Sequence, residues 1–396
     1  MRRPNAAIVG VGMTPVSLYP DRTSVGLAAE ALQGALADAG LARHDVDGLV
    51  WNLGRPSADD YDTTAEALGL SLRFVNQTWT HGRFTGTSIM LAALAVESGL
   101  ADYVACLGGI KRMPSINPAT YGTLPHGDLR AYGFGHFADE GALALRRYLH
   151  LYDADPDRLA DVVVALRRNA SLNELAWLRT PISREEYLAM PMTVEPLRAA
   201  DCFPANEAGV PLNDAGVCVI VGRRDATRDA RRPGVYLLAG QGIQAGREES
   251  YFGRPGLGLF TQSTSTYAPS RRDLRVFESA GMKPADVDGF YTYDAFSCEV
   301  WFALERFGHC APGEAPRWAS AERLSFDGAL PTNTNGGLIA EGHTAGWGQI
   351  VEMTRQLRHE CGPRQIRDAA VLQWATVFGD SFLLTNDAAL VGRGAA

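Results

Sequence analysis

The sequence repeats the segment Ala39-Gly-Leu-Ala-Arg-His-Asp-Val-Asp-Gly48 at a second place, as Ala280-Gly-Met-Lys-Pro-Ala-Asp-Val-Asp-Gly289. In each copy Ala-Gly is followed by four residues and then by Asp-Val-Asp-Gly. Each copy ends a predicted helix and opens an apolar strand. The same pattern at the same structural place predicts a duplicated α/β unit, with halves near 1–225 and 235–396.

The segment before the first copy has the order strand, helix, strand. Apolar residues at Ala6–Val9 predict a strand, and Ser24 and Gly40 are suited to begin and end a helix. The next strand is expected around Gly48–Trp51. This order favours an α/β sheet.

The composition is that of an ordinary globular protein. The 396 residues are 46% hydrophobic and 21% charged, and their number suggests two or three domain-sized units. A net charge of −8 without a basic run argues against nucleic acid as a partner. No apolar stretch reaches membrane-spanning length, and the first residues lack the apolar core of a secretory signal. Six scattered cysteines form no CxxC pair, so neither a metal site nor a disulfide framework is indicated. We expect a cytoplasmic protein without a membrane span.

Two long segments interrupt the α/β pattern. Between about 112 and 198, a polar loop at 113–132 precedes two amphipathic helices, predicted at Asp139–Leu151 and Pro156–Asn173. We expect an inserted helical loop subdomain that covers an active site, contacts a second protomer or elaborates the surface. A second loop, around Gln244–Arg272, has the length of a binding loop or lid.

A very apolar helix is predicted from Thr85 to Val96. A helix that is apolar on most faces is a buried helix. Its N-terminus is a potential anion or oxyanion site, because the first main-chain N–H groups of a helix have no partner within it.

A glycine-rich stretch, Asn333–Gly348, has five glycines in sixteen residues and places His343 just ahead of a predicted helix. It is either a turn with an incidental histidine or a loop in which a bulky ligand approaches main-chain N–H groups. Further candidates, Tyr291, Tyr293 and Asp294, lie at the end of the repeated strand. In α/β folds, ligand-binding groups gather at the carboxyl ends of strands.

Together these segments resemble the thiolase superfamily, and most closely its sterol-carrier-protein-x and lipid-transfer-protein branch. The family's His-Asp-Cys-Phe-Ser box reads Tyr293-Asp294-Ala295-Phe296-Ser297 here. Its Gly-Gly-Leu-Ile-x-x-Gly-His-x-x-Gly loop runs from Gly336 to Gly346 and keeps His343, and its Gln-Leu-Arg tail appears at 356–365. The resemblance implies a thiolase fold of the α/β class, with a duplicated α-β-α-β-α five-layer architecture and an inserted helical loop domain.

The departures from the family pattern concern its cysteines. The family's nucleophilic Cys-x-x-Gly motif aligns with Arg83-Phe84-Thr85-Gly86, and the segment of its second cysteine, Gln373–Gly379, has none. The histidine of the His-Asp box has become Tyr293. A mechanism that needs an activated thiolate is therefore not available.

Thiolase-fold aldolases that shorten steroid side chains also lack these cysteines, and the sequence resembles them in length and in the Tyr-Asp box. The resemblance implies a carbon–carbon lyase that cleaves a bulky steroid β-hydroxyacyl-CoA by a retro-aldol step, giving a ketone and a short acyl-CoA such as propionyl-CoA. Two alternatives stay open. One is a non-catalytic thiolase-like subunit or scaffold for a partner enzyme, and the other is a cysteine-independent condensing acyltransferase.

Tyr293 and His343 are the expected catalytic residues under this resemblance. Tyr293 would exchange a proton with the substrate, although strand tyrosines are also common core residues. His343 and nearby main-chain N–H groups would hold the thioester oxygen. Tyr291, two residues from Tyr293 on one sheet face, is a reserve candidate. Asp294 is expected to cap the following helix or to orient a neighbour rather than to do chemistry.

Two more secondary candidates precede the apolar helix. His81 is a possible second proton carrier, and Arg83 is a possible ligand for a carboxylate or a CoA phosphate, or a partner of Asp294. The loop glycines are expected mainly to shape the backbone and, as a consequence, to let the substrate approach: Gly336, Gly337, Gly342 and Gly346.

The resemblance also implies partners. We expect an acyl-CoA thioester substrate, a homodimer and a small partner protein of OB-fold and zinc-ribbon type. No separate cofactor is expected, because CoA is part of the substrate.

Overall fold

The computed structural model describes residues 5–52, 60–78, 84–111, 138–205, 212–225, 231–246, 249, 254–257 and 267–387. The strands are β1 (Ala6–Met13), β2 (Gly48–Asn52), β3 (Phe74–Thr78), β4 (Tyr103–Ile110), β5 (Met192–Val194), β6 (Leu197–Arg198), β7 (Ala215–Arg223), β8 (Val235–Gln241), β9 (Gly289–Thr292), β10 (Val371–Ala375) and β11 (Ser381–Thr385). The helices are α1 (Ser24–Ala39), α2 (Tyr61–Leu68), α3 (Thr85–Glu97), α5 (Asp139–Tyr152), α6 (Leu159–Ser171), α7 (Arg184–Leu188), α8 (Arg275–Ala280), α9 (Ser297–Arg306), α10 (Ala315–Trp318), α11 (Ala321–Leu324), α12 (Gly337–Ala340) and α13 (Trp347–Leu357). In the described part of the chain, no helix is both long and apolar enough to span a bilayer.

The repeated sequence folds in the same way in both places. Gly40 and Gly281 end helices α1 and α8 in the left-handed conformation, with φ of 74° and 68°. A short 3₁₀ turn follows in each copy. There, the carboxylates of Asp45 and Asp286 each accept a hydrogen bond of 2.7 Å from the main-chain N–H three residues earlier. The first aspartate of each Asp-Val-Asp-Gly segment therefore closes the turn that leads into the strand.

The second aspartate of each copy fixes the neighbouring strand. Asp47 accepts a bond of 3.0 Å from the N–H of Tyr103, the first residue of β4. Asp288 accepts one of 2.9 Å from the N–H of Val371, the first residue of β10. The repeat thus places equivalent strands side by side in both halves, which is why it specifies the fold.

The strand order confirms the predicted duplication. One sheet has the order β3-β2-β4-β7-β1-β8-β11-β10-β9. In the N-terminal half β2 pairs parallel with β4, and β4-β7-β1 are antiparallel. In the C-terminal half β9 pairs parallel with β10, and β10-β11-β8 are antiparallel. Among the described strands, the pairing that joins the two halves of the sheet is that of β1 with β8, at Ala7↔Tyr236 and Ile8↔Val235.

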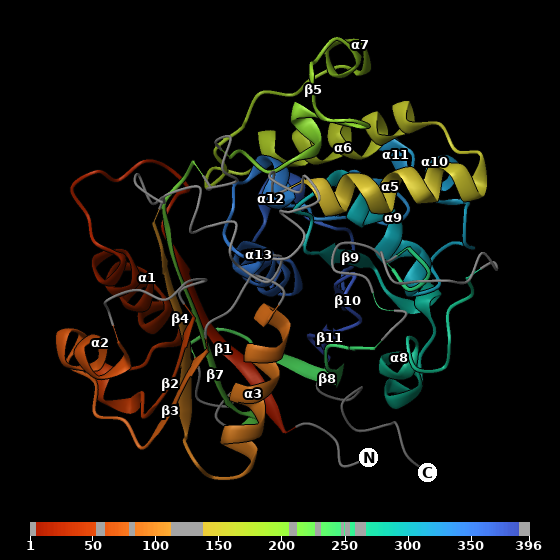
Figure 1. Ribbon diagram of the computed structural model, residues 1–396. Coiled ribbons are helices and arrows are strands. Elements are labelled where there is room, and N and C mark those ends of the chain that lie inside the picture. The colour runs from red at the N-terminus through yellow and green to blue at the C-terminus, as the bar shows by residue number, and fades with distance from the viewer. Residues whose placement is uncertain are drawn as a thin grey trace.

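The helices cover the two halves in layers (Figure 1). Alternate residues of β7 face opposite sides, so that Val217 and Val219 join the core containing α3, and Cys218 and Ile220 join the core under α1. Helix α13 contacts strands of both halves, whereas α8 and α9 pack on C-terminal strands. This arrangement of helices and strands in layers matches the five α-β-α-β-α layers that the resemblance implies.

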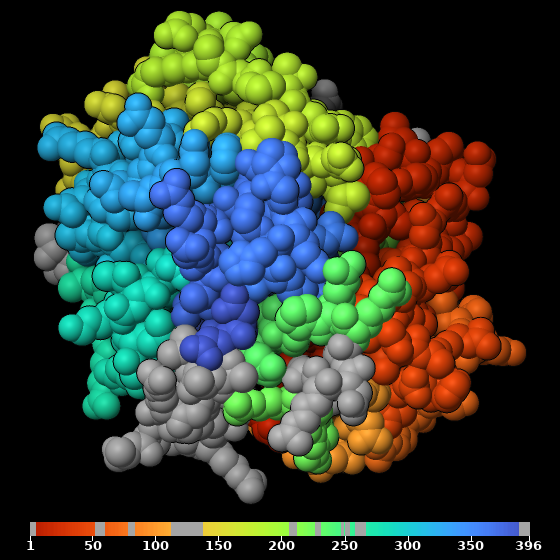
Figure 2. Space-filling view, turned by 180° about the vertical axis from the view of Figure 1, so that it is seen from behind, coloured from red at the N-terminus to blue at the C-terminus, as the bar shows by residue number. Residues whose placement is uncertain are grey.

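The insertion follows β4 of the N-terminal half but packs on the C-terminal half. Its helices α5 and α6 lie close to the predicted positions, and α6 contacts α9, α11 and α12. Seen from behind, the insertion covers one end of the molecule above the C-terminal half (Figure 2). Helix α12 belongs to the glycine–histidine loop, so the insertion lies over that loop. The predicted polar loop at 113–132 lies outside the described residues.

Glycines in three adjacent strands let α1 approach the sheet. A Cβ atom at Gly12, Gly109 or Gly216 would lie 2.1, 1.9 or 2.0 Å, respectively, from a main-chain oxygen of α1. Because these obstacles are backbone atoms, no side-chain movement relieves the overlap.

We expect Gly216→Ala to destabilise the protein by about 1–3 kcal/mol, because the new methyl group would force α1 away from the sheet. Gly34→Ala, within α1, is the matched control. Its Cβ would meet no atom closer than 3.5 Å, so removing a helical glycine should stabilise the protein by about 0.5–1 kcal/mol. Urea unfolding measures both, and equal effects would contradict this account of the packing.

Candidate active site

The structure brings Tyr293 and His343 together. Tyr293 directly follows β9, and His343 lies between α12 and α13. The Tyr293 hydroxyl and His343 Nε2 are 3.3 Å apart, with the two rings at 87° to each other. Tyr293 is buried and His343 is half-buried. A phenol and an imidazole within hydrogen-bonding distance are a suitable pair for moving a proton to or from a bound substrate.

The loop glycines are explained by backbone shape. Gly336, Gly337, Gly342 and Gly346 have φ of 107°, 63°, 120° and 87°, a region that side chains disfavour. A Cβ at each would also collide with another part of the chain, the nearest residues being Ala170, Asp294, Val16 and Trp374, respectively. Protein atoms therefore already occupy the space that these glycines leave.

Asp294 holds the start of α12. Its Oδ1 accepts hydrogen bonds from the Leu338 N–H at 2.9 Å and from Gln349 Nε2 at 3.1 Å. The helix that directly follows Asp294, α9, is capped instead by Glu299, which accepts from the Phe296 N–H at 3.1 Å. Of the two predicted roles, orienting a neighbour is the one that this geometry fits. Burial raises the pKa of Asp294 to about 8, although its hydrogen bonds act in the opposite direction.

The reserve candidate Tyr291 belongs to a different group of contacts. Its hydroxyl lies 2.6 Å from Thr334 Oγ1, which in turn donates to Glu352 at 2.8 Å. Glu352 forms a two-bond ion pair with Arg364, both bonds being 2.9 Å. Burial raises the pKa of Glu352, but Arg364 and the hydrogen bonds from Thr334 and Gln356 together outweigh it, and the net shift is downward. The Tyr291 hydroxyl thus lies with Thr334, whereas the Tyr293 hydroxyl lies beside His343.

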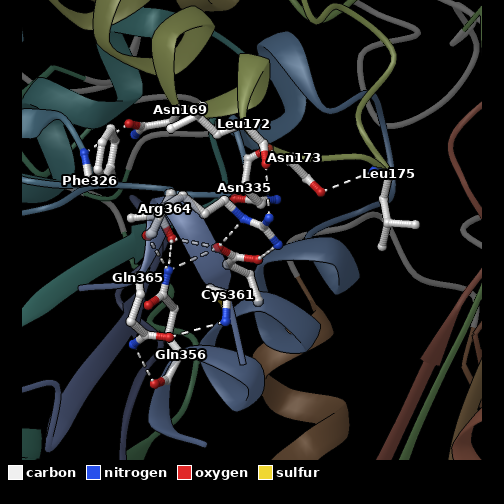
Figure 3. A network of polar contacts seen from close by, with 12 residues as sticks. Asn169, Leu172, Asn173, Leu175, Phe326, Asn335, Gln356, Cys361, Arg364 and Gln365 are labelled. Carbon is white, nitrogen blue, oxygen red and sulfur yellow. Dashed lines mark hydrogen bonds and ion pairs between the residues drawn. The ribbon is translucent and has the colours of Figure 1, made fainter. Parts of the chain in front are cut away.

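Amide side chains support the irregular backbone around the loop (Figure 3). Asn173, from the insertion, donates to the carbonyl of Asn335 at 2.9 Å and to Glu341 at 3.0 Å. Asn335 donates to the other Glu341 oxygen at 2.7 Å. Asn169 donates to the Thr332 carbonyl at 3.0 Å. The insertion is therefore hydrogen-bonded directly to the segment that carries His343.

Two residues that the sequence reasoning did not single out contact His343. Asn213 is fully buried and hydrogen-bonds to the main chain of His343, and the ring of Phe203 lies 4.5 Å from the His343 ring, centroid to centroid. Both precede β7 in the chain. The polar pair Asn213-Asp214 directly precedes an apolar strand, which is an ordinary place for polar side chains, so nothing in the sequence signals these contacts.

The N-terminus of α3 has a carboxyl group of the protein beside it. A Cβ at Gly86, in its first turn, would lie 2.7 Å from Asp380 Oδ2. Burial raises the pKa of Asp380 to about 6. The predicted anion site at this helix end therefore already has an internal acid next to it. The two candidates that precede the helix, His81 and Arg83, lie outside the described residues.

Comparisons with known proteins agree with this architecture. Residues 262–391 match the family model described as thiolase C-terminal domain-like. The "Steroid side-chain-cleaving aldolase" of Thermomonospora curvata is 30% identical over 375 residues, which cover 89% of this chain and 90% of that protein. The "17-hydroxy-3-oxo-4-pregnene-20-carboxyl-CoA lyase" of Mycobacterium tuberculosis is 31% identical over 378 residues, covering 89% and 91%. A solved structure described as "Ltp2-ChsH2(DUF35) aldolase" superposes with a TM-score of 0.86 at 27% identity, covering 98% of this chain and 100% of that chain.

The raised pKa of Asp294 predicts a pH-dependent stability. The folded protein keeps a proton on this carboxyl up to about pH 8, whereas the unfolded chain releases it near pH 4. The contribution of Asp294 to the stability of the folded protein is therefore fully present below about pH 4 and is lost as the pH rises through 8. We expect wild type to lose stability relative to Asp294→Asn between pH 5 and 8, by at most ~1.4 kcal/mol per pH unit.

Urea unfolding at a series of pH values measures this difference. Asp327→Asn is the control, because a hydrogen bond from Arg168 lowers the pKa of the exposed Asp327. The contribution of Asp327 to stability is lost only in acid. The difference in stability between Asp327→Asn and wild type should therefore stay constant from pH 5 to 8. Parallel curves for wild type and Asp294→Asn would contradict the assignment.

Proposed function

Because the chain belongs to the family of thiolase-fold, steroid side-chain-cleaving aldolases, we propose that it is a carbon–carbon lyase that cleaves a steroid β-hydroxyacyl-CoA by a retro-aldol reaction. The products are a steroid ketone and a short acyl-CoA, propionyl-CoA for a three-carbon side chain. The observation that carries the proposal is the hydrogen-bonding pair Tyr293–His343, at 3.3 Å, in a protein without the thiolase cysteines.

The reaction balances with one proton moved from oxygen to carbon. A base takes the proton of the β-hydroxyl group, the C–O bond becomes a carbonyl, and the Cα–Cβ bond breaks. Its electron pair passes into the thioester as an enolate, and Cα then receives a proton. No oxidant or reductant is required, so we propose that the enzyme uses no separate cofactor.

Tyr293 and His343 are suited to the two halves of this task. One of the two residues takes or returns the substrate proton through the hydrogen bond that they share. The other donates a hydrogen bond to the thioester oxygen as this oxygen gains negative charge. Main-chain N–H groups of the loop that already donate to a side chain, such as Leu338 N–H to Asp294, are engaged and do not donate to the substrate. They fix the backbone that carries His343, and a donor held in place in this way stabilises an enolate without reorganising during the reaction.

The relatives' names support the substrate class. The name of the Mycobacterium tuberculosis relative combines a 17-hydroxyl with a 20-carboxyl-CoA. In a pregnene skeleton these groups lie on adjacent carbons, so the hydroxyl is β to the thioester carbonyl. This is the arrangement that a retro-aldol cleavage requires.

A partner protein is part of the proposal. The similar solved structure is described as Ltp2-ChsH2(DUF35), and we propose that this chain assembles with a small DUF35-type protein of OB-fold and zinc-ribbon architecture. We also propose a homodimer. Within the described residues, β3 pairs only with β2 and leaves its outer edge for a second copy of the chain.

We propose that the enzyme works in the cytoplasm. Its six cysteines are free thiols buried in the core, as is usual for proteins of a reducing compartment. Fractionation of cells that produce the protein tests this placement.

Removing either member of the pair should abolish most of the activity. We expect Tyr293→Phe and His343→Ala each to lower kcat by ~10²-fold or more. The assay incubates 17-hydroxy-3-oxo-4-pregnene-20-carboxyl-CoA with the protein and quantifies ketone and propionyl-CoA. Tyr291→Phe is the matched control, since its hydroxyl bonds to Thr334. It should keep kcat and lose only about 1 kcal/mol of stability.

The same assay tests the partner and the reaction class. Cleavage that rises on addition of a DUF35-type protein, together with co-elution of the two in gel filtration, is the expected result. Unchanged substrate with and without that protein, while both remain folded, would sink the lyase proposal in favour of a scaffold role. Formation of a β-ketoacyl product from two thioesters would instead indicate a condensing acyltransferase.

A further inference from the structure

Asn213 supplies His343 with the main-chain hydrogen bonds that no helix or strand gives it. The His343 N–H donates to Asn213 Oδ1 at 2.8 Å, and Asn213 Nδ2 donates to the His343 carbonyl at 3.3 Å. One side chain thus forms the two main-chain hydrogen bonds that a neighbouring β-strand would otherwise form. Gly342 allows this approach, because its missing Cβ would lie 3.1 Å from Asn213 Oδ1.

The same device occurs beside Tyr293. Asn333 Oδ1 accepts from the Thr292 N–H at 2.9 Å, and Asn333 Nδ2 donates to the Thr292 carbonyl at 3.0 Å. Thr292 directly precedes Tyr293. Buried asparagines therefore hold the main chain of His343 and that of the residue directly before Tyr293.

Asn213 is itself rigidly placed. The next residue, Asp214, exchanges two main-chain hydrogen bonds with Ser17, at 2.7 and 3.2 Å. The Asp214 carboxylate is fully buried and pairs with Lys111 at 2.8 Å. These contacts belong to the N-terminal half, so they fix Asn213 independently of the loop that it holds.

The His343 ring is restrained from a second direction. The Phe203 ring packs against it at 4.5 Å between centroids, with 52° between the planes. Phe203 is anchored by its N–H, which donates to the Ala295 carbonyl at 3.1 Å. With the main chain held by Asn213 and the ring packed against Phe203, the imidazole keeps its Nε2 toward Tyr293.

We propose that Asn213 is a positioning residue, which acts through His343 by fixing its main chain so that the imidazole stays within hydrogen-bonding distance of the Tyr293 hydroxyl. This role rests on the proposed lyase function. A positioning residue affects the chemical step more than substrate binding, because a misplacement of about 1 Å can cost about 10²-fold in rate.

The test is a double-mutant cycle with 17-hydroxy-3-oxo-4-pregnene-20-carboxyl-CoA as substrate. Asn213→Ala should lower kcat by ~10- to 100-fold and leave KM within about 3-fold. In a His343→Ala background the same change should cost less than about 3-fold, because the group that it positions is gone. Asn386→Ala is the matched control. Asn386 also makes two hydrogen bonds to main-chain carbonyls, of Leu357 and Ala369, but does not touch the pair.

Several results would overturn the role. These are a wild-type kcat for Asn213→Ala, an undiminished loss in the His343→Ala background, or an equal loss in Asn386→Ala. A fully active His343→Ala would remove the group that Asn213 is said to position and would equally overturn it. If Asn213→Ala does not fold, Asn213→Asp replaces it in the cycle, since a carboxylate still accepts from the His343 N–H and loses only the donor.

A failure of the lyase function itself is distinguishable. If wild type leaves the thioester intact, the positioning role is judged by NMR of ¹³C-labelled histidine. The His343 ring resonance should then move in Asn213→Ala and not in Asn386→Ala. An unmoved resonance would overturn the role.

Discussion

The stretch from Thr332 to Gly346 is buried except at the half-buried His343, and α12 is its one short helix. Its main-chain polar groups must still be paired. Side chains from separate segments do this. Asp294 bonds to the start of α12, Asn173 to Asn335, and Asn213 to His343. Because an unpaired buried N–H or carbonyl costs about 1–3 kcal/mol, the loop is stable only when all of these segments are in place. The site is therefore a property of the assembled fold.

The same constraint explains the unusual acids around the site. Asp294 and Glu341 accept bonds from N–H donors, and burial raises the pKa of each to about 8. Glu352, in contrast, is ion-paired with Arg364. At neutral pH these three buried acids around the loop are thus either protonated or paired with a positive charge. A hydrogen bond in a partly buried place, such as Tyr293–His343, is electrostatically stronger than one in water.

The two halves have the same topology but different tasks. The second half contributes Tyr293 and His343, and the first contributes Asn213. The halves are joined by Arg358 at the end of α13, which bonds to Asp38 at 2.7 Å and to the Val9 carbonyl at 3.0 Å. The insertion adds Asn173, and the segment between the insertion and β7 adds Phe203. The site is therefore built from both halves, the insertion and this connecting segment.

The duplicated fold could be read from sequence because the repeat acts locally: Asp45 and Asp286 each bond to an N–H only three residues away. The positions of Tyr293 after a strand and His343 before a helix followed from the same kind of local pattern. Their contact spans 50 residues, and that of Asn213 with His343 spans 130. Such contacts depend on how the halves dock, and a single asparagine has no periodicity that predicts its partner. Tertiary structure alone decided that Asn213 holds His343, that Asp294 holds the start of α12 rather than that of α9, and that Tyr291 bonds to Thr334.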